Sequence, residues 1–441
     1  MTRIIAVLFL MLFMGPILAQ DAYAQDSAEV EKSYFLSFVQ NQLSTPNRQI
    51  VISGIQGVLS SEANIGSITI ADREGIWLRV TNARIVWSRL ALLRGRLDIN
   101  TLAADRIDIL RKPLPDESLP SPEAKGFSLP ELPLSVILQQ LNIGRIAFGD
   151  GVFGLKSEVS LAGNLTLASG SLDSSLQVQR LDGPGGEFQI KAAYANESQQ
   201  LDLDLTLNEP QNGIVANLLN IEGKPPVALA LKGSGPLSDL LLQLTLDAAG
   251  KRVLTGDTKL DRQSDGLGFK TNLNGEIAAL IPPIFRDFFG NETTLIVNGV
   301  MRDAGGVGLD RLNIKSNALV LDANGETTND GFLKRLKVDA TIADPTGKKV
   351  ILPVKGGQTT VDKAVLAVGF GTSTNNDWSS TVEVTNFTTD SFASKSINLV
   401  AKGLAENIDN PTARSLTYNV NGEVAGITAT RADMCRTTAR L

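Results

Sequence analysis

Residues Leu201 to Leu207 read Leu-Asp-Leu-Asp-Leu-Thr-Leu, so every second side chain is apolar. Successive side chains of an extended strand point to opposite faces of a sheet. This alternation therefore places the leucines on one face and the polar residues on the other. A helix would need apolar residues three and four positions apart. The stretch predicts a β-strand with one apolar and one polar face.

The same alternation recurs over most of the chain, which predicts a mainly β fold built as an antiparallel array. An ordinary β-sandwich core is the alternative that periodicity alone leaves open. The recurring stretches are Val227 to Lys232, Leu244 to Asp247, Leu309 to Ile314, Leu336 to Ile342, Val382 to Val384 and Leu416 to Val420.

Many of the predicted strands share an apolar-x-apolar-x-Gly cadence. We interpret its glycine as the end of a strand, where a positive φ or a local bend lets the chain turn back. The spacing between copies is irregular, so the chain does not fit a solenoid of fixed period. The glycines of this cadence are Gly163, Gly233, Gly299, Gly369, Gly403 and Gly422.

The composition argues against an enzyme. The chain has no histidine and a single cysteine, Cys435, among 441 residues. Serine–histidine and cysteine–histidine catalysis and histidine metal sites are therefore excluded. The carboxylates alternate along strands on the solvated side. We predict no catalytic residue, no cofactor site and no metal site.

The charge distribution bears on the partners of the chain. The formal net charge is −6, and phosphate binding needs clustered Lys and Arg, so we predict no nucleic-acid partner. Residues 72–112 nevertheless carry nine basic side chains against five acidic ones. Either a solvated strand face or contact with anionic lipid headgroups would account for this surplus.

The first residues have the pattern of an export signal. An apolar run from Ile4 to Ala19 follows Arg3, and Ala22-Tyr23-Ala24 has the small-x-small pattern of a cleavage site. As a helix this run would be about 24 Å long, shorter than the ~30 Å hydrocarbon core. We expect residues 1–24 to be a signal peptide cleaved after Ala24, with a retained inner-membrane anchor as the alternative.

Further segments have helical or extended patterns. Residues 31–43 have amphipathic helical spacing, and the stretches 212–222 and 283–290 each predict one short amphipathic helix between strands. The Pro-rich segment 113–133 reads as an extended spacer. We therefore divide the chain into an N-terminal helix with a first β-unit (25–112), the spacer (113–133), a repetitive β-array (134–427) and an irregular tail (428–441).

The most specific part of the sequence precedes the spacer. Asp72, Gly75 and Trp87 stand within an ordered series of short apolar stretches, and this order resembles the N-terminal region of TamB-like proteins of the AsmA-like superfamily. The segment from Gly223 to Leu237 is similar to TamB-like chains of alphaproteobacteria. The series comprises Ile52 to Gly57, Ile65 to Asp72, Gly75 to Leu78, Ala83 to Trp87, Leu92 to Ile99 and Ile107 to Pro113.

The resemblance implies an elongated, bent antiparallel sheet that forms a trough with an apolar inner face. It implies a non-enzymatic periplasmic bridge of the Gram-negative envelope that carries phospholipid acyl chains between inner and outer membranes. Family members are longer and end in a domain that meets a TamA-like outer-membrane barrel. The chain therefore resembles a truncated or frameshifted member, or a short paralogue with a disordered tail.

Two other functions remain open. An assembly factor for outer-membrane β-barrel or autotransporter proteins would offer sheet edges for strand pairing. A purely structural periplasmic protein would fill its apolar face with its own side chains. For the lipid bridge, alternation predicts that one apolar face contacts acyl chains through Leu203, Leu205, Leu229, Leu231, Leu244, Leu246, Leu312 and Val338.

Overall fold

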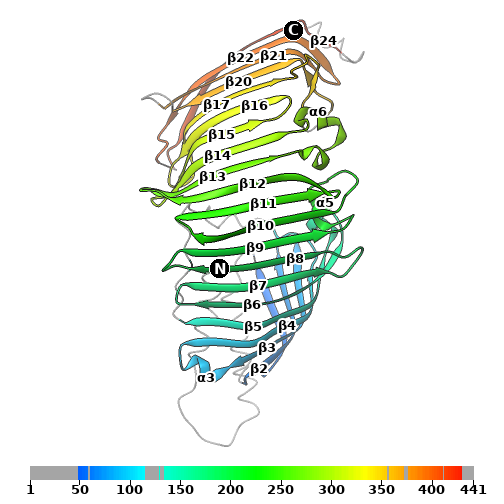
Figure 1. Cartoon of the computed structure of the whole chain (residues 1–441), viewed down its shortest axis with the longest axis vertical. Coiled ribbons are helices and arrows are strands. Elements are labelled where there is room, and N and C mark those ends of the chain that lie inside the picture. Colours follow the sequence, from blue (N-terminus) through cyan, green and yellow to red (C-terminus); the bar gives the residue numbers. More distant parts are fainter. Residues whose placement is uncertain are drawn as a thin grey trace, which may run out of the picture. The chain divides into compact units, whose positions relative to one another are not determined.

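The computed structural model describes residues 48–57, 60–114, 129, 134–354, 357–371, 376–410 and 412–429. Strands make up most of these residues, and the helices among them are short (Figure 1). The predicted mainly β, antiparallel fold is confirmed. The described residues divide into two compact units, one ending at Asn220 and the other beginning at Ile221. This boundary falls inside the stretch 134–427, which the sequence suggests is one array.

Several predicted segments lie outside the described residues: the signal or anchor 1–24, the helix within 31–43, and most of the spacer 113–133. Within the part of the chain that the structure describes, no helix combines the length and the apolar character needed to cross a bilayer.

The first unit is an open sheet in which strands that follow one another in the chain pair side by side (Figure 1). Three short helices interrupt it: α3 (Arg89–Leu92), α4 (Asp150–Phe153) and α5 (Ile214–Leu218). Its strands are β1 (Gln49–Gln56), β2 (Glu62–Asp72), β3 (Gly75–Ser88), β4 (Arg96–Ile109), β5 (Ser135–Phe148), β6 (Ser157–Ala168), β7 (Ser171–Arg180), β8 (Glu187–Ala195) and β9 (Gln200–Glu209).

One pair in this unit departs from the antiparallel pattern. β4 and β5 run parallel, with Leu97 opposite Val136 and Ile109 opposite Phe148. A parallel pair needs a long connection that returns the chain to the same end of the sheet. The connection between Ile109 and Ser135, which contains the predicted spacer, has the required length. The alternation pattern fixes which face a side chain occupies but not the direction of the neighbouring strand.

Residues on which the family resemblance rests stabilise the first strands. The Asp72 carboxylate accepts hydrogen bonds from Arg111 Nη1 at 2.8 Å and from the Leu114 amide at 3.0 Å. Hydrogen bonding to Arg111 holds the pKa of Asp72 well below its usual range. The indole Nε1 of Trp87 donates to the Ser60 carbonyl oxygen at 2.8 Å. These contacts tie together strand ends that are distant in sequence.

The strands of the second unit also pair as successive hairpins, with η1 (Ile277–Leu280), η2 (Pro283–Phe285) and α6 (Arg286–Phe289) inserted between β13 and β14. Its strands are β10 (Val227–Pro236), β11 (Asp239–Ala248), β12 (Lys251–Arg262), β13 (Gly266–Gly275), β14 (Thr293–Arg302), β15 (Val307–Lys315), β16 (Leu319–Thr327), β17 (Leu333–Ala343), β18 (Val350–Ile351), β19 (Thr360–Val361), β20 (Lys363–Phe370), β21 (Asp377–Thr388), β22 (Phe392–Glu406), β23 (Ser415–Ala425) and β24 (Thr428–Ala429).

Both predicted inter-strand helices are present. The stretch 212–222 contains α5, and the stretch 283–290 contains η2 and α6. Gly290 ends α6 with a positive φ of 68°, where glycine carries no steric penalty. The predicted irregular tail begins two residues too early, because Thr428 and Ala429 form β24 and pair with β22. Residues 430–441 lie outside the described part of the chain.

The interpretation of the glycine cadence is wrong. All six glycines lie inside strands, and none has a positive φ. At five of them, Gly369 excepted, a Cβ would collide with a side chain of the neighbouring strand. A Cβ at Gly163 would lie 2.7 Å from Leu176 Cδ2, and one at Gly299 would lie 2.7 Å from Phe269 Cζ. In each case a large apolar side chain lies across a glycine, which is a known use of glycine inside sheets.

We expect Gly163→Ala to destabilise the first unit by about 2 kcal/mol, because the added methyl group would collide with Leu176 and with the Ser175 carbonyl. Gly66→Ala in β2 is the matched control, since its Cβ would meet Gly54 Cα at an ordinary 3.5 Å. Urea denaturation followed by tryptophan fluorescence measures both. Equal stabilities of the two variants would contradict this role for glycine.

Candidate functional site: a half-buried apolar face and its margins

The strand register defines one apolar face in the second unit. Residues directly opposite one another on paired strands share a face of the sheet. Leu231 lies opposite Leu244, and Leu229 lies opposite Leu246. The row through Leu231 continues across ten further strands and is aliphatic apart from one glycine. It consists of Leu231, Leu244, Gly256, Leu273, Leu295, Ile314, Leu321, Ala340, Leu366, Val382 and Leu399.

The other predicted residues of this unit lie on the same face. Leu312 is opposite Ala323, and Val338 is opposite Ala323 from the other side. This second row runs beside the first, because residues two positions apart in a strand share a face. The six predicted positions from Leu229 to Val338 are therefore brought together on the apolar face of the second unit.

Leu203 and Leu205 belong to the equivalent face of the first unit. Leu205 lies opposite Ile190, which lies opposite Leu176. Leu203 lies opposite Ala192 in the same pair of strands. The two predicted positions of β9 are thus part of an aliphatic face formed by the strands of their own unit.

The exposure of these side chains distinguishes the face from a sandwich core. All eight predicted residues are half-buried, whereas the inner faces of a β-sandwich bury each other. The largest fully buried side chains lie elsewhere: Ile221 precedes β10, Leu240 is near the start of β11, and Val361 is in the short β19. Burial is therefore deepest near strand ends and incomplete in the middle of the faces.

A small core covers one margin of the face in the second unit. Phe288 of α6, Ala318, Val350 of β18 and Val361 of β19 form a buried cluster. Against it packs a row of half-buried residues at one end of the central strands, namely Leu319, Ile342, Ala364 and Val384.

The opposite margin has a second core. Phe370, Ala405 and Ile408 are buried there, with Leu336 and Trp378 against them. The indole Nε1 of Trp378 donates to the Thr417 carbonyl oxygen at 3.1 Å. The rows through Leu321 and Ala323 lie between these two cores in register. The face of the second unit is closed at its margins and half-exposed along its centre.

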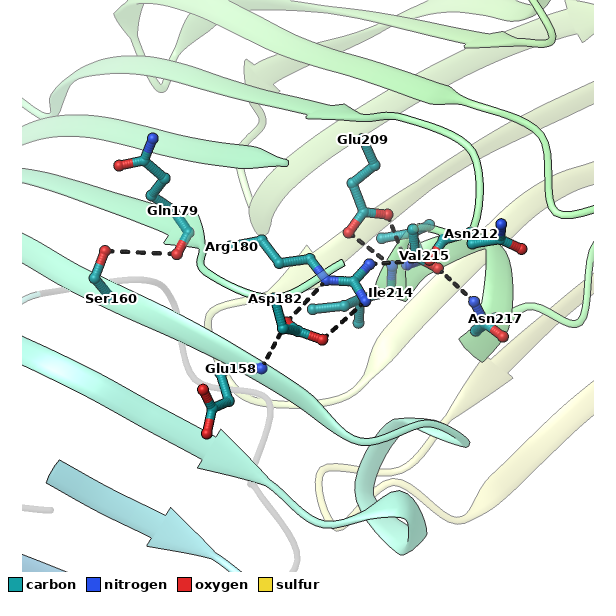
Figure 2. A network of polar contacts seen from close by, with 11 residues as sticks. Glu158, Ser160, Gln179, Arg180, Asp182, Glu209, Asn212, Ile214, Val215 and Asn217 are labelled. Carbon is teal, nitrogen blue, oxygen red and sulfur yellow. Dashed lines mark hydrogen bonds and ion pairs between the residues drawn. The ribbon is translucent and has the colours of Figure 1, made fainter. Parts of the chain in front are cut away.

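Polar side chains form a margin in the first unit, as Figure 2 shows. Arg180 lies two residues after Val178 at the end of β7, and Glu209 lies two residues after Leu207 at the end of β9. Both therefore occupy positions on the apolar face. Both are buried, with exposed fractions of 8% and 7%. Neither residue is among the predicted site residues, although a charged residue at an apolar position of the alternation is a visible signal.

Each of these two charges has partners that compensate for its burial. Arg180 Nε donates to Asp182 Oδ1 at 3.1 Å, and its Nη1 donates to the Asn212 carbonyl oxygen at 2.9 Å. The Glu209 carboxylate accepts the amides of Ile214 at 2.9 Å and Val215 at 2.7 Å (Figure 2). The network thereby fixes the start of α5 at the end of the apolar face, where Ala216 is fully buried.

The pKa of Asp182 is set by opposing effects. Burial raises it, but the hydrogen bonds from Arg180 and from the Glu158 amide outweigh burial, so the pKa lies below its ordinary value. A carboxyl group with a lowered pKa stabilises the fold above its unfolded pKa of about 3.9, and this contribution is lost as the pH falls through the folded-state value. Asp182 therefore favours the folded state at neutral pH.

Comparison with protein families identifies the chain. The model of the YdbH-like family, described as intermembrane phospholipid transport protein YdbH, matches residues 32–284, which is more than half of the chain. The chain belongs to the YdbH-like family. Neither the curated proteins nor the solved structures contain a match to it.

Membership of the YdbH-like family places the chain among AsmA-like lipid-transport proteins. The resemblance to the AsmA-like superfamily is thereby confirmed. The family model does not single out TamB-like proteins. The family is one of lipid transport, not an enzyme family. The matched residues include the whole first unit described here and the first strands of the second.

We expect Arg180→Met to destabilise the first unit by about 2 kcal/mol or more, because it leaves Asp182 and the Asn212 carbonyl without their buried partner. Arg145→Met is the control, since Arg145 is half-exposed and lies 3.5 Å from Glu158. An exposed ion pair contributes roughly 0 to 1 kcal/mol.

Unfolding of this unit can be followed in a Trp378→Phe background, where Trp77 and Trp87 of the first unit are the remaining tryptophans. The difference in the free energy of unfolding between Arg180→Met and the parent should shrink as the pH falls below about 3.9. Protonation of Asp182 then removes the ion pair in the parent as well. A pH-independent difference would contradict the role of Asp182.

Proposed function

We propose that this chain carries phospholipid acyl chains along its apolar sheet faces between the inner and outer membranes of the Gram-negative envelope. The observation that carries the proposal is the half-exposure of long aliphatic rows between covered margins. Half-exposed leucine and valine side chains in register offer a surface that an acyl chain can cover. Membership of a phospholipid-transport family supports the same function.

The energetic need for such a face is large. Moving a phospholipid with about thirty chain methylenes through water costs on the order of 20 kcal/mol at ~0.8 kcal/mol per methylene. Contact with aliphatic side chains removes part of this cost, and it also covers apolar area that the protein exposes to water. Headgroups stay hydrated, and no residue has to perform chemistry.

The proposal includes the cellular location of the chain. We propose that the chain acts on the periplasmic side of the inner membrane, either held by residues 1–24 or released by cleavage after Ala24. N-terminal sequencing of the mature protein decides between these forms. A chain that starts at Gln25 is expected, whereas one that starts at Met1 would mean that the segment is retained.

Photo-crosslinking tests the lipid path. A photoreactive phenylalanine derivative at Leu205 or Leu244 should label phospholipid. The same residue at the preceding position, Asp204 or Gln243, should not, because alternate positions face opposite sides of the sheet. Each unit thus carries its own matched pair. Equal labelling within a pair, or labelling only of proteins, would overturn the proposal.

Two substitutions that introduce a positive charge test lipid transfer itself. We expect Leu244→Arg to block lipid transfer, because a cation among aliphatic side chains obstructs an acyl chain. Gln243→Arg should leave transfer intact, since Gln243 is exposed and lies opposite Asp257. Native mass spectrometry of the purified chain should correspondingly detect bound phospholipid in the parent and in Gln243→Arg, and less in Leu244→Arg.

One observation favours assembly of outer-membrane proteins as a second candidate. Every residue of β23 is exposed, and within the described residues β23 pairs only with β22. A client strand or a TamA-like barrel partner could add to such an edge. Crosslinks from Asn419 to client proteins, without lipid labelling at Leu205 or Leu244, would favour this candidate. As a TamB-like factor, the chain would need that partner to reach the outer membrane.

A further inference from the structure

The turn that joins β3 to β4, residues 88–96, exposes two leucines at the end of the first sheet. Leu90 and Leu93 have exposed fractions of 71% and 85%. They are three positions apart in the helical turn that begins with α3, so they point to the same side. Unlike the half-buried residues of the apolar face, these side chains lie almost entirely in water.

The exposure is a property of an ordered turn. The Ser88 hydroxyl oxygen accepts the Ala91 amide at 3.4 Å, and the Arg94 amide donates to the Ala91 carbonyl at 3.0 Å. Ala91 faces inward, with only 5% of its surface exposed. Gly95 completes the turn at a φ of 71°, and its carbonyl oxygen accepts the Ser135 amide at 3.1 Å. Because the turn is held at both ends, the leucines stay outside.

All charged residues within the turn itself are basic. Arg89, Arg94 and Arg96 lie within the turn, and the sequence contains no Asp or Glu between Glu74 and Asp98. Arg96 Nη2 lies 2.6 Å from Asp98 Oδ2. Arg89 and Arg94 flank the leucine pair in the sequence. An outward apolar pair between cations is the pattern of segments that lie at the interface of anionic membranes.

We propose that the turn 88–96 docks onto the surface of an anionic bilayer. Leu90 and Leu93 enter the region below the headgroups, and Arg94 contacts a lipid phosphate. This contact is separate from the acyl-chain face, whose residues lie along the strands, and it does not depend on acyl-chain transport. It holds the β3–β4 end of the first unit against a membrane surface.

A fluorescent probe at the tip tests the proposal in the full chain. In a Cys435→Ser background, Leu93→Cys provides a single site for an environment-sensitive nitrobenzoxadiazole label. Vesicles of phosphatidylcholine with phosphatidylglycerol should shift its emission to the blue, and lipids with a quencher on the acyl chain should quench it. Vesicles of phosphatidylcholine alone should produce a much weaker response.

A matched control separates the turn from membrane binding by other parts of the chain. Leu181 is also an exposed leucine, at 47%, but it follows β7 at the other end of the first sheet and precedes Asp182. The same label at Leu181→Cys should show neither the blue shift nor the quenching. Leu90→Cys is a second probe position, and far-UV circular dichroism checks that each labelled chain retains its strands.

The charge contribution is tested by Arg94→Gln in the Leu93→Cys chain. Its response to anionic vesicles should require about fivefold more lipid, since a basic residue near such a surface contributes ~1 kcal/mol. Added salt should weaken the parent's response. The proposal is overturned by no response at positions 90 and 93, by equal responses at 93 and 181, or by equal responses with and without phosphatidylglycerol. None of these outcomes bears on lipid labelling at Leu205 and Leu244.

Discussion

The structure depends on the two-residue period of the extended chain. Because successive side chains alternate, a run such as Leu229 to Lys232 must place its leucines on one face, and antiparallel pairing brings these leucines opposite those of the next strand. Repetition of the pattern builds a wide apolar face within each unit. Exposure of such a face to water is unfavourable, since exposed apolar area costs ~25 cal/mol per Å². In the second unit the chain provides its own cover at the margins, around Val361 and Phe370, and leaves the centre half-exposed.

The margins are built differently in the two units. In the second unit they are small hydrophobic cores, in which short inserted elements pack on the ends of the strand rows. In the first unit, buried Arg180 and Glu209 occupy positions where the alternation would place apolar residues. A buried charge is tolerated only with well-placed partners, and here the partners are Asp182, a loop carbonyl and the first amides of α5. The polar margin therefore specifies where α5 docks, which an apolar contact would define less sharply.

Glycines within the strands contribute to the same surface. At Gly163 and Gly299 a leucine or phenylalanine from the next strand lies across the backbone. A residue with a Cβ at either position would collide with that side chain. This close approach accounts for glycine in the interior of these strands.

Sequence alone determined the strands, their apolar and polar faces, both inserted helices and the lipid-transport class of the family. These follow from local rules: alternation sets faces, a stripe of apolar residues sets a helix, and the ordered stretches around Asp72 and Trp87 carry the resemblance. The register and the parallel direction of β4 and β5 were decided by tertiary structure, because alternation is the same for either strand direction.

The same holds for the glycine contacts, the network around Arg180, and the separation of covered margins from a half-exposed centre. Each depends on which residue of another strand or loop comes to lie alongside. The turn 88–96 shows the difference most clearly. Its leucines and arginines are visible in the sequence, but only the fold, by burying Ala91 and holding Gly95, leaves Leu90 and Leu93 in water.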